Sequence, residues 1–352
     1  MILLQITKSD AGQRFDKYLK RQLKEAQSSF IYKMLRKKNI VLNGKKATGS
    51  ELLCEKDEVR LFLSEETYEK FRAGGASSQT HRNETTYQSA YNRLKNIEIV
   101  FENAHILILN KPTGILSQKA KPEDLSANEW LIGYLLETGA VSPDSLLTFK
   151  PSVCNRLDRN TSGLLACGKT LIGSRYLSSI IKDKSLEKYY YTLAAGDGMP
   201  DARVCGWLYK DTKNNQVTIF EKESDIPHSV RRDAEYIDTA FKHVKTIRLS
   251  NTDISLLEVR LFTGKTHQIR AQLGAMGYPI IGDRKYGNSQ INKLFYDMGV
   301  RNQLLHAYKI VFPNTQDETF SDISGRTLLC DPPAIWKRLT EVSYGDMEIE
   351  RA

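Results

Sequence analysis

The chain changes character over residues 64–93, where hydrophobic side chains lose any regular spacing. This stretch, "SEETYEKFRAGGASSQTHRNETTYQSAYNR", gathers Gly, Ser, Thr, Asn and Gln, a composition typical of linkers. A chain of 352 residues also exceeds the size at which single hydrophobic cores stop growing. We therefore expect a small domain over residues 1–63, a flexible linker over 64–93, a large domain over 94–340 and a C-terminal tail over 341–352.

Positive charge is concentrated in the small domain. Residues 1–63 hold 14 of the 51 Lys and Arg residues and 7 of the 42 Asp and Glu residues, hence +7 of the net charge of +9. The rest of the chain is then nearly neutral, at +2. A basic arm on a neutral body indicates a polyanionic partner, although a merely soluble basic surface gives the same count.

Several classes of protein conflict with the composition. Hydrophobic residues make up 40% and charged residues 26%, as in globular proteins, and the longest apolar runs are too short to span a bilayer. The N-terminus, "MILLQITKSD", lacks the features of a signal peptide, so we expect a cytoplasmic protein with no membrane partner. The five cysteines and six histidines of the chain are dispersed, which argues against a disulfide framework and against a metal site.

Two amphipathic helices are predicted in the small domain. The first, "RFDKYLKRQL", places Phe15, Leu19 and Leu23 at helical spacing. The second, "SSFIYKMLRKKN", begins at Ser28 and Ser29, which are suited to cap it, and leaves its basic residues on the outer face. A strand and an Asn-Gly turn follow in "IVLNGKKA", and "EKDEVRLFL" closes the domain as a further strand.

This order resembles the S4-type RNA-binding domain over about residues 12–63. The shared pattern is R-[FL]-D-x-x-L, followed by S-x-x-x-I-x-x-x-[LI]-x-x-x-x-I-x-[VL]-N-G; Lys56 departs from the usual glycine. The resemblance implies that the second helix and the turn lie along structured RNA, where Lys and Arg contact phosphates. The RNA-binding residues expected in this arm are Lys33, Arg36, Lys37, Lys38, Lys45 and Lys46.

From about residue 97 the chain favours short strands. "IEIVFENAHILILNKP" predicts two strands around a turn, and "EKYYYTLAAG" and "DISLLEVRLFTG" predict further strands. "SRYLSSIIKD" and "THQIRAQLGAMG" predict helices. Because strands outnumber helices and do not alternate with them, we expect an α+β fold with a mainly antiparallel sheet.

One loop, "CNRLDRNTSGLLACGKT", carries a single carboxylate, Asp158, between Arg156 and Arg159. In isolation such a cluster fits a surface ion-pair network. The apolar run after Thr161 instead anchors the loop in a core, as a functional site requires. Arginines that keep the carboxylate ionised make it a poor general acid, but suit a nucleophile or a group that stabilises positive charge on a sugar.

The same loop resembles the catalytic loop of RluA-type pseudouridine synthases, H-R-L-D-x-x-T-S-G-[LV]. Four more segments resemble that family in the expected order: "LNKPTGILS", "EKYYYTLAAG", "LFTGKTHQIRAQLGAMGYPIIGDRKYG" and "LLHAYKIVFP". With the small domain, the resemblance spans nearly the whole chain outside the linker. It implies the pseudouridine synthase fold and the isomerisation of RNA uridines without a metal or an organic cofactor.

The resemblance also implies residue roles. Asp158 is expected to act at C1′ of a flipped-out uridine, either by attack or by assisting elimination to a glycal. Tyr190 is expected to stack on the base and to handle its proton, Arg270 to pair with Asp158, and Arg156 to fill the gap in the RNA stack. Further contacts to the RNA are expected from Asn155, Arg159 and Thr161.

Other residues in the motifs have structural interpretations. Tyr190 lies in a run of three tyrosines, and strand tyrosines usually serve in packing. We interpret His267 and Gln268 as organisers of a loop, and Asp283, Tyr286 and His306 as parts of the fold. Asn155 stands where the family more often has histidine, which leaves its role open.

Three functions remain under consideration. The first is a pseudouridine synthase that acts as a monomer. We expect its substrate to be 23S ribosomal RNA, and transfer RNA is the alternative. A non-catalytic RNA-binding or ribosome-assembly protein would keep the basic arm but has no need of Asp158, Tyr190 and Arg270 together. A nucleoside hydrolase would require a second carboxylate near Asp158, which the loop lacks.

Overall fold

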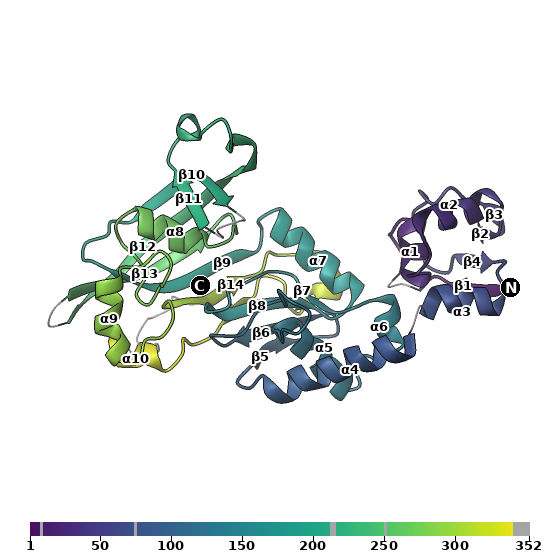
Figure 1. Cartoon of the computed structure of the whole chain (residues 1–352), viewed down its shortest axis with the longest axis horizontal. Helices are drawn as coiled ribbons and strands as arrows, with labels where there is room; N and C mark the ends of the chain where they lie inside the picture. The colour runs from purple at the N-terminus through teal and green to yellow at the C-terminus, as the bar shows by residue number, and fades with distance from the viewer. Residues whose placement is uncertain (8–9, 74–75, 212–215, 250–251, 341–352) are drawn as a thin grey trace.

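The structure, a computed structural model, describes residues 1–7, 10–73, 76–211, 216–249 and 252–340. Figure 1 shows a small N-terminal part that contains α1 and α2 and a large part built on a long sheet. The tail predicted over 341–352 lies outside the described residues.

The small part contains a four-stranded antiparallel sheet in the order β1-β4-β2-β3. Its elements are β1 (Ile2–Gln5), α1 (Phe15–Gln22), α2 (Ser28–Arg36), β2 (Ile40–Leu42), β3 (Lys45–Lys46), β4 (Glu58–Leu61) and α3 (Glu65–Ala73). Phe15, Leu19 and Leu23 are fully buried, which confirms the first predicted helix. Asn43 and Gly44 take the φ values of 49° and 71° that a tight hairpin turn demands, so β2 and β3 pair as expected.

Two details of this part differ from the sequence prediction. The residue at the N-cap of α2 is Gln27, with no side-chain capping bond, and Ser28 is already inside the helix, so the predicted serine caps are wrong. Strand β1 was not predicted at all. It pairs antiparallel with β4 at the edge of the sheet, and only this tertiary pairing distinguishes "ILLQ" from any short apolar run.

Two helices occupy the stretch predicted to be a flexible linker, α3 and α4 (Ala76–Arg93). Phe71 of α3 packs on Phe30 of the small part, with ring centroids 4.5 Å apart. Tyr87 and Ala90 of α4 are buried against the large part. The described part of this stretch is therefore helical where the sequence predicted irregular chain, because its few apolar residues lie at helical spacing and each group packs on its own neighbour.

The large part is α+β, as predicted, with eleven described strands in one mixed sheet. Nine of them follow the order β11-β10-β12-β13-β9-β14-β8-β6-β5, while β15 pairs with β14 and β7 with β8. All pairs are antiparallel except β14 with β8. The strands are β5 (Glu98–Glu102), β6 (Ile106–Lys111), β7 (Ser152–Val153), β8 (Ser162–Gly168), β9 (Glu187–Ala195), β10 (Ala202–Asp211), β11 (Gln216–Phe220), β12 (Ala234–Leu249), β13 (Thr252–Leu261), β14 (Leu305–Val311) and β15 (Thr327–Leu329).

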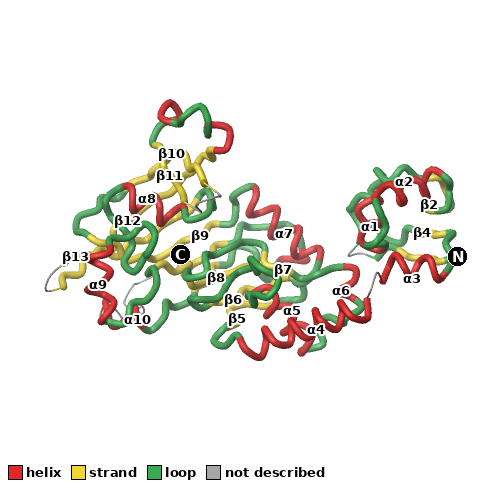
Figure 2. Tube along the Cα trace, viewed as in Figure 1, coloured by secondary structure: helices red, strands yellow, loops and turns green. Residues whose placement is uncertain are grey.

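Helices cover both faces of this sheet, as Figure 2 shows for α7 on one side and α4 and α5 on the other. The helices are α5 (Ala127–Glu137), α6 (Ser145–Thr148), α7 (Leu171–Lys182), α8 (Gln268–Ala275), α9 (Ser289–Asp297) and α10 (Ile335–Thr340). In β8, Leu164 and Ala166 face the core under α7, while Leu165 and Cys167 face the core under α5. This double burial explains the uninterrupted apolar run that follows the Asp158 loop.

The parallel contact between β8 and β14 depends on one glycine. Gly163 has φ 115°, and a Cβ there would stand 2.2 Å from the carbonyl oxygen of Ala307 on β14. Only glycine permits this approach. The close contact fixes β8 directly after the Asp158 loop, and so fixes the base of the loop.

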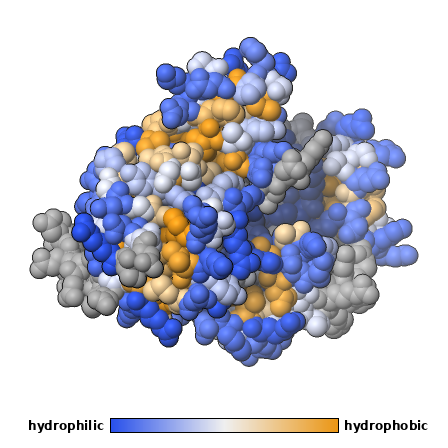
Figure 3. Space-filling view, turned by 60° about the vertical axis from the view of Figure 1, so that its left-hand side comes forward, coloured by the Kyte–Doolittle hydropathy of each residue, from blue (hydrophilic) through white to orange (hydrophobic). Residues whose placement is uncertain are grey.

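One face of the molecule is mostly hydrophilic (Figure 3). Figure 3 shows hydrophobic patches on a largely blue face, with a hollow right of its centre that hydrophilic residues line. Within the described residues, every helix is too short or too polar to cross a membrane.

Candidate active site

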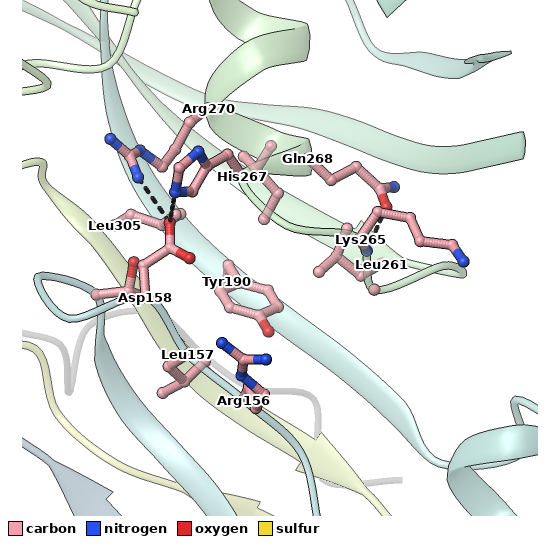
Figure 4. A pocket seen from close by; sticks show the side chains of 13 residues that line it. Arg156, Leu157, Asp158, Tyr190, Leu261, Lys265, His267, Gln268, Arg270 and Leu305 are labelled. Atoms are coloured by element: carbon pink, nitrogen blue, oxygen red, sulfur yellow. Dashed lines mark hydrogen bonds and ion pairs between the residues drawn. The ribbon is translucent and has the colours of Figure 1, made fainter. Parts of the chain in front are cut away.

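The Asp158 loop connects β7 to β8 and is anchored on both sides. The Leu157 N–H donates to Ser117 Oγ at 2.9 Å, and that hydroxyl donates to the Leu157 carbonyl oxygen at 2.8 Å. The Thr161 N–H donates to the Asp158 carbonyl oxygen at 3.1 Å. These bonds hold the backbone on both sides of Asp158, and Figure 4 shows its carboxylate directed toward Arg270 and His267.

A buried lysine at the end of β6 supports the loop from beneath. Lys111 Nζ donates to the carbonyl oxygens of Ile115 at 2.8 Å, Pro112 at 3.0 Å and Arg159 at 3.2 Å. Burial lowers the pKa of Lys111 to about 7, while the charge of Asp158 acts in the opposite direction. Lys111 is not among the residues predicted for the site, although a lysine two residues after the apolar run "ILIL", at the end of a buried strand, is a usable signal.

Arg270 holds the Asp158 carboxylate. Its Nη1 donates to Asp158 Oδ2 at 2.7 Å, while Nε and Nη2 donate to the two oxygens of Asp283 at 2.7 and 2.9 Å. Burial alone would lower the pKa of the Arg270 guanidinium, but the hydrogen bonds and charges of Asp283 and Asp158 raise it above the usual range. The arginine is thus a fixed cation shared between two carboxylates.

The arginine that binds Asp158 differs from the two that flank it in the loop. The sequence predicted that Arg156 and Arg159 hold the carboxylate ionised, whereas the arginine bonded to Asp158 is Arg270, 112 residues along the chain. The predicted pairing of Arg270 with Asp158 is present. Asp283 was assigned to the fold, and in the structure it is the buried group that orients Arg270.

Tyr190 is the tyrosine of its run that faces the pocket. Figure 4 places its ring between Asp158 and Arg156. Its neighbours serve elsewhere, since the Tyr189 hydroxyl donates to Glu187 at 2.6 Å and Tyr191 stacks on Tyr308 at 3.8 Å. Burial first, and then the charge of Asp158, raises the pKa of Tyr190 above its usual range. The phenol therefore stays neutral at ordinary pH.

His267 lies closer to the carboxylate than the sequence indicated. Its Nε2 is 3.8 Å from Asp158 Oδ2, and its Nδ1 is 2.9 Å from the Tyr286 hydroxyl. The backbone at His267 is left-handed, with φ 57°, at the start of α8. Burial lowers the pKa of His267, so the neutral imidazole is favoured. Gln268 acts as the predicted loop organiser, since its Oε1 accepts from the Lys265 N–H at 3.0 Å.

The remaining predicted residues divide into two groups. Arg156 and Thr161 line the pocket with Asp158, Tyr190 and Arg270, around a space of about 420 Å³. Asn155 and Arg159 do not line it. Asn155 Oδ1 accepts from the Ala166 N–H at 2.7 Å, a bond that fastens the loop to β8, and the Arg159 side chain is exposed.

Two other predictions concern residues outside the pocket. His306 is fully buried between Ser162 Oγ, 2.9 Å from its Nδ1, and the Cys330 carbonyl oxygen, 3.1 Å from its Nε2, which is a structural role. The basic residues predicted for the arm are all exposed: Lys33, Arg36, Lys37, Lys38, Lys45 and Lys46. Over the part of the chain that the structure describes, His, Cys, Asp and Glu nowhere gather in a group that could hold a metal ion.

Comparison with known proteins points to one activity. Residues 105–275 match the family described as RNA pseudouridylate synthase. An uncharacterized RNA pseudouridine synthase of Mycoplasma genitalium is 29% identical over 325 residues, covering 92% of this chain and 93% of its own length. The ribosomal large subunit pseudouridine synthase C of Vibrio vulnificus is 27% identical over 325 residues, covering 92% of this chain and 91% of its own.

A solved structure shares the fold. Human RNA pseudouridylate synthase domain containing 4 superposes with a TM-score of 0.52 at 16% identity. The match covers 73% of this chain and 94% of the human chain.

Proposed function

We propose that this chain is an RNA pseudouridine synthase of the RluA family and that it converts uridines of large-subunit ribosomal RNA into pseudouridine through Asp158. The observation that carries the catalytic part is the fixed ion pair of Asp158 and Arg270 beside the Tyr190 ring. The ribosomal part rests on two supports: relatives named ribosomal large subunit pseudouridine synthase C, and the exposed basic arm.

The geometry suits an attack or an electrostatic role at the sugar. Arg270 and His267 approach the same oxygen of Asp158, Oδ2, and Figure 4 shows the other oxygen on the side of the Tyr190 ring. An ionised carboxylate at this place can bond to C1′ or stabilise its positive charge. Because Arg270 is held by Asp283, the pair needs no rearrangement when charge develops.

The isomerisation then balances without water. The C1′–N1 bond breaks, and the uracil leaves with the bonding electrons. The base turns, C5 bonds to C1′, the proton on C5 is lost and N1 regains a proton. Uracil is never released to solvent, so no second carboxylate is required to activate a water molecule, unlike in glycoside hydrolysis.

Tyr190 holds the base during these steps, and Arg156 holds the RNA from which the base has left. The neutral Tyr190 ring offers a face on which the uracil can stack while it turns. Arg156 is exposed at the mouth of the pocket, where its side chain can enter the gap that a flipped-out uridine leaves in the RNA.

The test is a map of pseudouridine in total RNA from cells that lack the chain, restored with wild-type protein, Asp158→Asn or the exposed Asp225→Asn as control. We expect specific sites in large-subunit RNA to lose pseudouridine and to regain it with wild type and Asp225→Asn only. Loss confined to transfer RNA would contradict the substrate, and restoration by Asp158→Asn would contradict the catalyst.

A further inference from the structure

A second, larger groove opens from the pocket. It spans about 1430 Å³, part of which is open to solvent, and shares Arg156, Tyr190 and Lys265 with the pocket. From there it extends past the end of α7 to Tyr236 on β12 and Phe262 after β13. A chain that enters the pocket with one unit can therefore continue along this groove.

The groove is positively charged along its length. Lys182, Lys184 and Lys188 line its wall, beyond Arg156 at the pocket end. Among the described residues that line it, Glu235 is the one carboxylate, and it is neutralised by an ion pair with Lys265. A series of lysines without an opposing negative wall is the arrangement that binds a phosphate backbone.

A flat, rigid surface lies beside the Phe262 end of the groove, on a residue that contacts its lining. The guanidinium of Arg203 lies 4.3 Å from the centre of the Phe262 ring and forms a two-pronged bond to Asp238, at 3.0 and 2.7 Å. Its side chain is nevertheless 60% exposed. The guanidinium is therefore held in one plane and still open to a ligand.

Aromatic side chains continue this surface. The register of β10 with β12 opposes Trp207 to Tyr236 and Cys205 to Asp238, which puts them on the same face as Arg203. Trp207 and Tyr236 meet edge to face at 5.9 Å, and Tyr236 is 45% exposed. This face of β10 and β12 thus carries aromatic and guanidinium groups, on which bases can stack, next to the basic groove.

We propose that this groove binds the unpaired nucleotides on one side of the target uridine, with bases stacked on Tyr236 and the Arg203 guanidinium. The phosphates of the same strand lie along Lys182, Lys184 and Lys188. This inference rests on the proposed function, since the pocket at the other end must take the target uridine. Stacking on these side chains requires exposed base faces, so the chain should prefer a target flanked by single-stranded RNA over one inside a duplex.

The test measures binding to two fluorescein-labelled 12-nucleotide RNAs. The first has all its bases and one central uridine; the second keeps the uridine and has abasic sugars at the eleven remaining positions. Wild type should bind the intact strand at least about fivefold more tightly than the abasic strand. The double variant Arg203→Ala/Tyr236→Ala should bind both strands alike. Because Asp238 loses its partner in that variant, the single variant Tyr236→Leu should show the same direction of change.

Two further variants separate base contacts from phosphate contacts. Lys182→Ala/Lys184→Ala should weaken binding of both strands equally and reduce the salt dependence. The control Tyr296→Ala/Arg301→Ala removes another exposed arginine–aromatic pair, 3.6 Å apart and outside the groove, and should bind as wild type.

Each outcome decides one claim. If both Tyr236 variants keep the wild-type preference for the intact strand, the groove proposal is wrong. This holds even if ribosomal RNA is modified normally. If wild type modifies no RNA while the variants lose the preference, the groove stands and the proposed function falls.

Discussion

In the pocket, the Arg270 cation is buried and bonded to two carboxylates, whereas the cations of the arm are exposed along α2 and the β2–β3 turn. The buried charge has one geometry, because three of its nitrogens donate to fixed carboxylates. The exposed charges adopt many geometries, because lysine side chains on a surface keep their rotamer freedom. We therefore propose that the two regions use the same kind of charge differently: the pocket for positioning and the arm for affinity to RNA.

The largest effect on stability and rate is expected from a substitution of Asp283 in the pocket. In Asp283→Asn, Arg270 loses its buried counter-charge, and the orientation of Asp158 should relax. Breaking a buried ion pair costs about 3 kcal/mol of the free energy of unfolding, and misplacing a catalytic group costs on the order of 100-fold in rate. Thermal unfolding and single-turnover pseudouridine formation measure the two effects.

A matched control is available in the small domain. Asp10→Asn breaks the Arg21–Asp10 pair, which is 2.7 Å long but more exposed. It should cost less than about 1 kcal/mol and leave the rate unchanged. Equal losses in the two variants would show that burial does not distinguish the pocket pair.

A smaller effect is expected at Lys111. Lys111→Met keeps the approximate size of the side chain but removes three donors beneath the loop, so the rate should fall on the order of tenfold, while the exposed Lys121→Met should not change it. A wild-type rate in Lys111→Met would mean that the loop holds itself in place.

The same lysine gives a dependence on pH. Its pKa is about 7 in the folded chain and about 10.4 when unfolded, so between pH 7 and 9 the unfolded chain binds more protons. The free energy of unfolding should therefore rise with pH in this window, by at most about 1.4 kcal/mol per unit. Denaturant titrations of wild type and Lys111→Met should show a steeper rise in the wild type; parallel curves would refute the assignment.

The smallest effects per residue are expected in the arm. Lys37→Ala/Lys38→Ala/Lys45→Ala should weaken RNA binding several-fold and lower the slope of log affinity against log salt by up to about 1 per residue. The rate at saturating RNA should stay unchanged. Lys337→Ala/Arg338→Ala, which removes two exposed cations on α10, is the control. A reduced rate at saturation would mean that the arm also positions the uridine.

Sequence analysis captured what short-range patterns determine. The α2 face, the Asn43-Gly44 turn, the two strands around residues 103–105 and the Asp158 loop all follow from local spacing. The surroundings of the Asp158–Arg270 pair did not follow, because Asp283 reaches Arg270, and His267 reaches Asp158, only through the packing of α8 and the loop after it. The helices in residues 65–93 were missed because their apolar residues are sparse, and each helix is stabilised by a neighbouring domain instead of its own composition.

The central claim is that Asp158, fixed by Arg270, performs the chemistry. The most direct measurement is single-turnover conversion of unmodified large-subunit ribosomal RNA by wild type and Asp158→Asn, read by chromatography of the digested nucleosides, which separates the two isomers. We predict that Asp158→Asn binds the RNA with wild-type affinity and forms no pseudouridine. Pseudouridine formation by this variant at a rate within tenfold of wild type would contradict the account.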